Sequence, residues 1–437
     1  MQTPAPSFAE LLRVFGRIGL INFGGPAGQI ALMHKTLVDE KQWIEEDAYL
    51  RALNFCHLLP GPEAQQLATS IGWKLHGLRG GLAAGLLFII PGAVVVLGLS
   101  ILYAYAADLS PVAAALLGVK AAVLAIVVEA LLRIAQRALG TRLKQVIALT
   151  AFIALAVFSA PFPLVVLGAG LIGFVVAARR PDLLALKPGG AAAPAAPVRI
   201  RGVLLTISGW LALWAAPLAL AFLWLGPDHV LVEVGVFFSK LAMVTFGGAY
   251  AVLSYMAQEA VSAHGWLKPA EMVDGLGLAE TTPGPLILVT EYVGFLAGFR
   301  NPAPFTPLLA GTLAALMTLW VTFAPCFLWI FGFAPFIERL QHARRLQGAL
   351  AAITAAVVGV IGNLTLWFAL HVLFARFEPR GFGPLTLSLP APASLDWRAV
   401  VLSLLAAVLL FRFRVGVIRT IGAVLVAGLA FYVVGPR

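Results

Sequence analysis

Charged residues and cysteines are scarce in this sequence. Asp, Glu, Lys and Arg make up 11% of its 437 residues, whereas an average soluble domain has about 25%. The two cysteines, Cys56 and Cys326, stand in apolar surroundings and belong to no Cys-x-x-Cys or Cys/His cluster. This composition lies far outside that of soluble domains, and it argues against a disulfide framework and against a structural metal site.

The signature motifs of several enzyme classes are also missing. The sequence has no Walker A loop, no Gly-x-Ser-x-Gly, no His-Glu-x-x-His and no dinucleotide-binding fingerprint. These motifs carry the local chemistry of their classes. We therefore expect a protein that is not an enzyme, that holds no cofactor or metal, and that does not drive transport with ATP.

Apolar residues are abundant instead, at 61% of the chain. A bilayer crossing takes about 20 residues, and the sequence predicts an all-α, polytopic membrane protein in contact with lipid. The expected crossings are 81–105, 112–132, 145–160, 163–178, 203–225, 304–333, 347–370, 397–411 and 416–433, of which 145–160 and 397–411 are short. The net charge of +10 comes from short loops between these runs, which indicates the positive-inside rule rather than nucleic-acid binding.

The chain repeats itself after 223 residues. Phe15-Gly-Arg-Ile-Gly-Leu-Ile-Asn-Phe-Gly-Gly25 returns as Phe238-Ser-Lys-Leu-Ala-Met-Val-Thr-Phe-Gly-Gly248, Trp43 returns as Trp266, and Pro60-Gly-Pro62 returns as Pro283-Gly-Pro285. A constant offset over about fifty residues indicates an ancestral duplication. In an apolar chain, two homologous halves are typical of transporters.

A loop rich in Pro, Gly and Arg at 179–201 separates the halves. We divide the chain into a first repeat at 1–180, a linker with a connecting helix at 181–230, and a second repeat at 231–437. Positive-inside counting predicts inverted halves, with 203–225 as the extra crossing and 145–178 as a helical hairpin. The arginines after residue 375 support this orientation only weakly, because they fall on both sides.

Each half contains interruptions at two matched points. Gly24-Gly25-Pro26 and Pro60-Gly61-Pro62 in the first half correspond to Gly247-Gly248 and Pro283-Gly284-Pro285 in the second. Proline and glycine should break these helices within the membrane and make them re-entrant. A helix that restarts after Pro-Gly-Pro offers free N–H groups and a positive dipole end to an anion. The alternative is a set of kinks that serve only packing.

Polar and charged residues near these breaks are candidates for binding an anion. Arg17 and Lys240 occupy the same repeat position, and together they suit a dianion, unless they merely reach toward lipid headgroups. Gln65 and Gln66 bring amide donors for oxyanion oxygens.

Three further ionisable residues are candidates for coupling transport to protons. His57 and Glu280 share a repeat position just before Pro-Gly-Pro, and Glu291 follows the second Pro-Gly-Pro motif. An imidazole and carboxyl groups near a cavity can carry protons. The alternative is that they are hydrogen-bonded interior groups that fix packing.

The chain resembles the chromate ion transporter family in its long, two-domain form. The strings that carry the resemblance are Phe23-Gly-Gly-Pro-Ala-Gly-Gln-Ile30 and Leu53-Asn-Phe-Cys-His-Leu-Leu-Pro-Gly-Pro-Glu-Ala-Gln-Gln-Leu-Ala68, echoed by Thr245-Phe-Gly-Gly248 and Thr282-Pro-Gly-Pro285. The resemblance implies export of chromate, a sulfate-like dianion, by secondary anion transport or antiport across the bacterial inner membrane, and resistance to chromate.

The resemblance also assigns motif residues to substrate binding. In the first half these are Asn22, Gly24, Gly25, Pro26, Gln29, Pro60, Gly61, Pro62, Glu63 and Gln66, and in the second half Thr245, Gly247, Gly248, Thr282, Pro283, Gly284 and Pro285. The second copy departs where Ala249, Leu286 and Val289 replace Pro26, Glu63 and Gln66. We therefore expect the first half to dominate anion recognition.

Other functions remain open from the sequence. The closest alternative is uptake of sulfate or another oxyanion by proton symport. An integral membrane enzyme on a lipid-linked phosphate would need a cluster of acid and nucleophile that we do not find, and a channel is a further alternative. Homo-oligomerisation also stays open.

Overall fold

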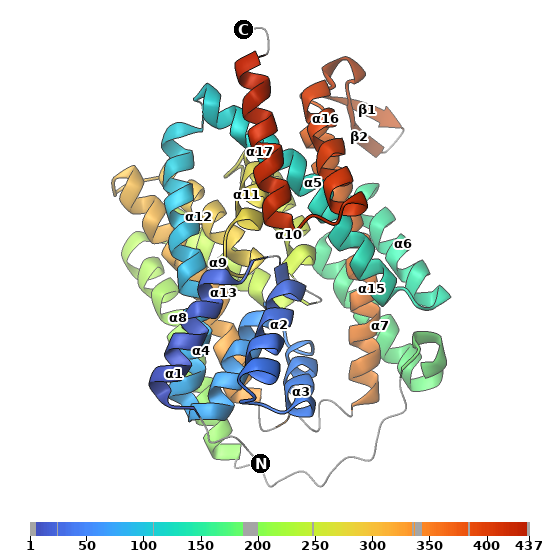
Figure 1. Cartoon of the computed structure of the whole chain (residues 1–437). Helices are drawn as coiled ribbons and strands as arrows, with labels where there is room; N and C mark the ends of the chain where they lie inside the picture. Colours follow the sequence, from blue (N-terminus) through green and yellow to red (C-terminus); the bar gives the residue numbers. More distant parts are fainter. Residues whose placement is uncertain are drawn as a thin grey trace.

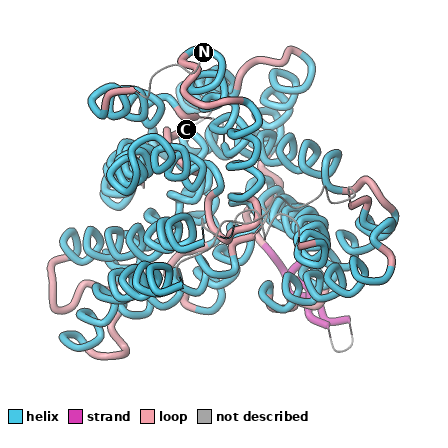
Figure 2. The backbone as a smooth tube through the Cα atoms, turned by 90° about the horizontal axis from the view of Figure 1, so that it is seen from below, coloured by secondary structure: helices cyan, strands magenta, loops and turns pink. Residues whose placement is uncertain are grey.

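The computed structural model describes residues 6–23, 25–107, 109–186, 200–246, 249–333, 336, 343–382 and 385–434. These residues form an almost entirely helical protein with one peripheral hairpin of two antiparallel strands (Figures 1 and 2). Six of the described helices are long and apolar enough to cross a membrane. The expected class, an all-α polytopic membrane protein, is confirmed.

The first half contains α1 (Phe8–Ile21), α2 (Gly25–His34), η1 (Lys35–Glu40), α3 (Glu46–Cys56), α4 (Glu63–Ala106), α5 (Ser110–Ala138), α6 (Arg142–Ala156), α7 (Phe162–Arg179) and η2 (Pro181–Leu184). A connecting helix, α8 (Ile200–Leu225), follows. The second half contains α9 (Val230–Val244), α10 (Ala249–Gln258), η3 (Glu259–Ala263), α11 (Pro269–Thr281), η4 (Leu286–Leu288), α12 (Val289–Arg300), α13 (Pro307–Phe333), α15 (Arg344–Leu373), β1 (Phe377–Phe382), β2 (Leu385–Pro390), η6 (Pro392–Ser394), α16 (Trp397–Ala407), η7 (Val408–Arg412) and α17 (Val417–Val434).

Local sequence explains where the first helix begins and which face it buries. The Ser7 hydroxyl caps α1 by accepting a hydrogen bond from the Glu10 N–H at 3.2 Å, a favoured way to satisfy an N-terminal amide. Leu11, Phe15 and Ile18 then recur at helical spacing and are buried. This face packs on α4.

The duplication is visible in the hydrogen bonds of the two halves. The Trp43 N–H donates to the Leu37 carbonyl at 2.9 Å, and the Trp266 N–H donates to the Ala260 carbonyl at 2.9 Å. Each bond ties the residues after a π-helical segment, η1 or η3, back to that segment, and both pairs of residues keep the offset of 223. Later in each half the offset becomes 234, because α5 begins at Ser110 and α15 at Arg344.

The two halves are inverted relative to each other, as expected. Gly81 of α4 lies against the ring of Phe331 on α13, and Gly85 lies against the ring of Phe327. Residue numbers rise along one helix as they fall along the other, so the two helices are antiparallel. Because α4 and α13 are repeat counterparts, antiparallel packing means that one half is upside down in the membrane.

The last two helices of each half pack against a helix of the other half. Helix α7 packs on α15, where Gly173 meets Gly348, while α17 packs on α5, where Gly428 meets Gly118. Helices α6 and α16 follow the same exchange. In Figure 1 α6 and α7 lie beside α15, and α17 lies beside α5.

Helix α8 has no counterpart in the repeat and lies on the outside. The Trp214 indole N–H donates to the Val321 carbonyl at 3.1 Å, which holds α8 against α13. None of its most apolar 18-residue window is buried inside the protein, so this face suits lipid. The expected hairpin at 145–178 is α6 and α7; α6 has 15 residues, fewer than a crossing needs.

Candidate functional site

Two re-entrant hairpins enter the molecule from opposite faces. In the first half α3 leads in to Pro60-Gly61-Pro62, and α4 leads back out to a kink at Gly77, which has φ +60°. In the second half α11 and α12 do the same around Pro283-Gly284-Pro285. The broken helices predicted from sequence are thus present. Irregular backbone passes through the middle of the helix bundle in Figure 2.

The hairpin tips are held by reciprocal hydrogen bonds between the halves. The Gly61 N–H donates to the Thr245 carbonyl at 2.8 Å. The Gly284 N–H donates to the Asn22 side-chain Oδ1 at 2.6 Å and approaches the Asn22 carbonyl at 3.4 Å. Asn22 and Thr245 are repeat counterparts, as are Gly61 and Gly284. The two bonds therefore mark the centre of the inverted repeat.

A glutamine completes the contact around the second tip. The Gln29 amide N–H group donates to the Gly284 carbonyl at 2.6 Å and to the Asn22 carbonyl at 3.1 Å. Asn22 and Gln29 are both buried. Their side chains satisfy backbone groups that the broken helices leave free, which stabilises irregular backbone inside a membrane protein.

Both tips need glycine for backbone and for space. Gly61 has φ +117° and Gly284 has φ +102°, values that residues with a Cβ atom rarely adopt. A Cβ atom on Gly61 would lie 3.0 Å from the Cys326 Sγ, and one on Gly284 would lie 3.2 Å from the Gly92 Cα.

The helix after the first tip begins as the sequence predicts. Helix α4 starts at Glu63, and Pro62 stands at its N-cap position. Gln65 and Gln66 are buried, but their amide N–H groups are engaged within the protein, on the Thr69 hydroxyl at 3.0 Å and the Pro60 carbonyl at 2.6 Å. Their predicted contact with an oxyanion stays a prediction.

A cavity of about 460 Å³ reaches this helix start from one face of the protein. It runs between α2, α3 and α5 and carries both cationic and apolar residues. Its lining is Gly25, Pro26, Ala27, Ile30, Ala31, His34, Tyr49, Leu50, Leu53, His57, Glu63, Ala130, Arg133, Ile134 and Arg137. We call this space the open vestibule. It joins the broken segment at Pro26 to the positive end of α4.

Most charged groups at the open vestibule lie near a group of opposite charge, and one arginine does not. His57 Nδ1 lies 3.8 Å from Glu63 Oε1, and Arg133 forms an ion pair with Glu129, one turn earlier on α5. Arg137 forms no ion pair with the described residues. The vestibule therefore offers an anion a guanidinium group and a helix N-terminus.

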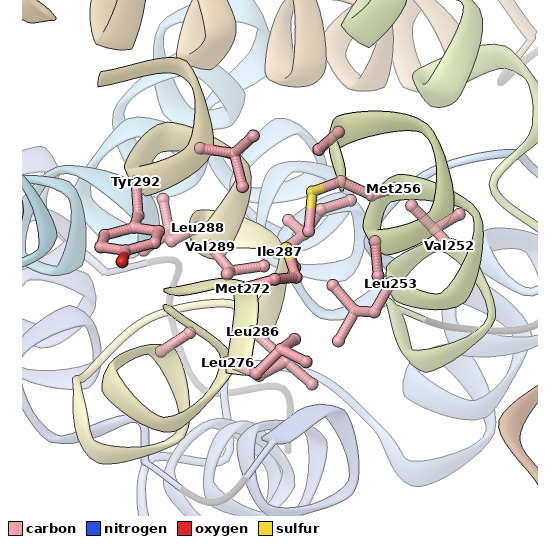
Figure 3. Close-up of a cluster of buried hydrophobic side chains, with 14 of the residues drawn as sticks. Val252, Leu253, Met256, Met272, Leu276, Leu286, Ile287, Leu288, Val289 and Tyr292 are labelled. Atoms are coloured by element: carbon pink, nitrogen blue, oxygen red, sulfur yellow. The ribbon is translucent and has the colours of Figure 1, made fainter. Parts of the chain in front are cut away.

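The second hairpin tip has a different environment. Leu286, Ile287 and Leu288 follow its Pro-Gly-Pro motif as a short 3-10 turn, where the first half has polar side chains. Figure 3 shows them packed among apolar side chains that include Leu253 and Leu276. The expectation that the first half dominates anion recognition stays a prediction.

The proton-coupling candidates of the second half lie inside this apolar region. Glu280 and Glu291 are both buried, as is Thr282, whose hydroxyl donates to the Ala279 carbonyl at 3.0 Å. Neither carboxyl oxygen of Glu291 has a hydrogen-bond partner among the described residues.

Two predicted cations lie away from the centre. Arg17 and Lys240 are exposed on α1 and α9, outside the faces by which these helices pack. Their predicted role in binding stays a prediction, and these exposed positions favour the alternative that they reach toward lipid headgroups. Gly24, Gly247 and Gly248 lie outside the described residues.

Sequence reasoning missed two groups of ionisable residues. Arg133 and Arg137 were interpreted only as topology signals, although both line the open vestibule. Lys120 and Asp274 form an ion pair with 2.9 Å between Nζ and Oδ1, which joins α5 of the first half to α11 of the second. The four-residue spacing of the two arginines on one helix was the available signal for the first group.

Inverted halves, re-entrant hairpins that meet at the centre, and a cavity that reaches them from one face together define a multi-pass membrane protein with the internal repeats typical of transporters. The chain belongs to the Chromate transporter family, whose model matches residues 9–174 and 232–432. It is similar to proteins named chromate transport protein in Pseudomonas aeruginosa, at 32% identity over 83% of this chain and 81% of the relative, and in Cupriavidus metallidurans, at 27% identity over 84% of each. A probable chromate transport protein of Synechococcus elongatus is 26% identical over 82% of this chain and 84% of the relative. No solved structure matches the chain.

Proposed function

We propose that this protein exports chromate, a sulfate-like dianion, across the bacterial inner membrane and so confers resistance to chromate. The family and the names of its relatives support the substrate. The observation that carries the proposal is the open vestibule, which places the Arg137 guanidinium and the start of α4 around one space. A volume of about 460 Å³ is typical of a small-molecule site.

The membrane potential favours the proposed direction. A charge that moves across a membrane changes its free energy by about 2.3 kcal/mol per 100 mV, so a dianion leaving a negative-inside cell gains about 4.6 kcal/mol. The basic residues of the vestibule belong to the cluster that the positive-inside rule places in the cytoplasm. The open vestibule thus faces the cytoplasm in this proposal, and the anion enters there.

Glu63 supplies a reason for coupling to protons. Its carboxyl group stands at the start of α4, where an incoming anion would also be stabilised. Two negative groups repel each other at that point, so anion binding favours protonation of the His57 and Glu63 pair, whose atoms lie 3.8 Å apart. The buried carboxyl group of Glu291, which has no hydrogen-bond partner among the described residues, is a further proton carrier in this proposal, because an ionised carboxylate is costly there.

The test is chromate uptake into everted membrane vesicles, with sulfate as competitor. We expect saturable uptake that responds to membrane potential or to a pH gradient. Replacing Arg137→Gln should raise the KM for chromate about tenfold, since a charge-assisted contact contributes about 1.5 kcal/mol. Arg142→Gln is the matched control, because Arg142 belongs to the same basic cluster but does not line the vestibule. Equal KM values for both variants would contradict the assignment.

Uptake of sulfate by proton symport is the second candidate. The ionisable pair in the open vestibule favours it, because the pair can carry a proton together with the anion. Expression in a sensitive strain separates the two functions: export gives tolerance to chromate, whereas uptake gives greater sensitivity.

A further inference from the structure

A second, nearly closed cavity lies at the repeat-related position of the open vestibule. Its volume is about 10 Å³. Six of its eight lining residues are repeat counterparts of residues that line the open vestibule. The pairs are Leu253 and Ile30, Leu276 and Leu53, Glu280 and His57, Leu286 and Glu63, Leu364 and Ala130, and Phe368 and Ile134. Because the halves are inverted, this closed vestibule points toward the opposite face of the membrane.

Larger apolar side chains fill the closed vestibule. Leu364 and Phe368 stand where the open vestibule has Ala130 and Ile134, and Leu286 stands where it has a glutamate. Leu253, Leu286 and Phe368 are each at most 2% exposed. Figure 3 shows Leu253, Leu276 and Leu286 converging from α10, α11 and η4. Apolar side chains therefore fill this route in the present conformation.

An ion pair between the halves lies between the closed vestibule and the membrane face beyond it. Lys120 precedes Val123 by one turn on α5, and Val123 lines the cavity. Lys120 Nζ lies 2.9 Å from Asp274 Oδ1, and the Tyr103 hydroxyl donates to Asp274 Oδ2 at 2.8 Å. Tyr103 is one turn from the end of α4. The cluster therefore bridges α4 and α5 of one half and α11 of the other at the outer mouth.

The open vestibule carries different residue types at the repeat positions of this ion pair. The repeat counterparts of Lys120 and Asp274 are Thr354 and Arg51. A threonine and an arginine cannot form an ion pair, and the Thr354 hydroxyl donates to the Leu350 carbonyl of its own helix at 2.8 Å. The Lys120–Asp274 pair that stands across the closed route is therefore not repeated between the same two repeat positions on the open one.

The energetics of a buried ion pair suit a contact that breaks and re-forms. The side chains of Lys120 and Asp274 are 20% and 6% exposed. The free energy that is needed to desolvate two charges offsets much of their Coulomb attraction. When the route opens, water reaches both groups and replaces their attraction with hydration. The pair can therefore separate at a modest net cost, while loss of one partner leaves a charge buried alone.

We propose that Lys120, Asp274 and Tyr103 form a latch that holds the second vestibule shut in this conformation, and that its release opens that vestibule toward the outer face. Opening would expose Glu280 as His57 is exposed in the present conformation. The inference rests on the proposed transport function, but it concerns access to the two vestibules, which can be measured without any substrate.

The experiment compares cysteine labelling on the two routes. Cys56 and Cys326 are buried and are replaced by alanine. Leu276→Cys then reports on the closed vestibule and Leu53→Cys on its counterpart in the open one. A charged, membrane-impermeant thiol reagent is applied to right-side-out and to everted vesicles. With the latch intact, we expect rapid labelling of Leu53→Cys from the cytoplasmic face and slow labelling of Leu276→Cys from the outer face.

Breaking the latch with Asp274→Asn should exchange the two accessibilities. We expect labelling of Leu276→Cys from the outer face to rise at least tenfold while labelling of Leu53→Cys falls. Exchanging the charges, with Lys120→Asp and Asp274→Lys together, should return both rates toward their original values. Glu271→Gln is the matched control, since it breaks an ion pair on the same helix that does not join the halves; it should change neither rate more than about twofold.

The outcomes separate the latch from the proposed substrate. Unchanged labelling in Asp274→Asn overturns the latch, and so does a rise at both cysteines, because a latch trades one access for the other. Chromate flux in the intact protein with unchanged labelling leaves the transport function standing without the latch. If the labelling rates are exchanged in a protein that transports no chromate, the result supports the latch and overturns the proposal that chromate is the substrate.

Discussion

Two single residues, Gly61 and Gly284, allow the tips of the two re-entrant hairpins to meet closely at the centre. We call this contact the crossing of the two hairpins. Replacing either with alanine should reduce stability by about 1 to 3 kcal/mol, because the positive φ becomes strained and the new Cβ atom meets neighbouring atoms. Thermal unfolding of the detergent-purified protein measures the loss. Gly168→Ala is the control, since a Cβ atom at that helical position would have no described atom within 4 Å apart from its chain neighbours and the backbone of its own helix; it should be neutral or slightly stabilising. Equal stability of all three variants would contradict the close crossing.

The sequence predicted the residues of the crossing better than those of the cavity. Gly61 and Gly284 stood out because breaks and repeats leave a mark in the sequence, and Asn22 stood out through the family resemblance. The sequence did not tell that Arg137 lines the open vestibule whereas Arg17 is exposed on α1. A membrane helix is apolar on its lipid face as well as its buried face, so its hydrophobic pattern does not tell which side carries an arginine toward the protein.

At the scale of elements, an ion pair clamps the open end of the second hairpin. Arg300 at the end of α12 donates two hydrogen bonds to Glu271 near the start of α11, at 2.8 and 2.6 Å. Partial burial of Glu271 opposes its ionisation, but the Arg300 guanidinium and the Lys268 N–H outweigh this effect and lower the pKa of the carboxyl group. The carboxylate is therefore ionised and clamped at neutral pH.

The lowered pKa gives the clamp a defined pH dependence. Its contribution is present above the ordinary carboxyl pKa of the unfolded chain and is lost as the pH falls through the lower pKa of the folded protein. We expect Glu271→Gln to lower the Tm by about 2 °C at pH 7, because the clamp contributes about 1 kcal/mol to the free energy of unfolding. The decrease in Tm should be smaller under acidic conditions. Glu10→Gln, which breaks the exposed pair with Lys41, should have a smaller effect. A Tm difference that grows as the pH falls would contradict this sign.

The sequence predicted most elements and few of their contacts. The hairpin of α6 and α7 was recognisable from its apolar runs and from Pro161-Phe-Pro163, and α8 was recognisable as the crossing without a counterpart. The packing of α7 on α15 was not recognisable from the sequence. The glycines at this contact are common in membrane helices, and a glycine does not indicate which helix packs against it.

For the whole molecule, the exchange of terminal helices makes each half incomplete without the other. Helix α15 is covered by α6 and α7, and α5 by α16 and α17. A chain divided between Leu186 and Ile200 should therefore yield fragments that are degraded when expressed singly. The same fragments expressed together should copurify and recover transport. Protease protection of each fragment by itself would contradict the need for exchange.

The exchange also has a consequence for the time course of synthesis. The surface of α5 that receives α17 is made when Ala138 leaves the ribosome, but its partner is finished only at Val434, roughly 300 residues later. At about 5 to 20 residues per second, α5 waits some 15 to 60 seconds in the bilayer before α17 arrives. During that interval lipid or another membrane protein must cover the surface of α5 around Gly118. Among the described helices, the one that closes the first half is thus the last in the sequence.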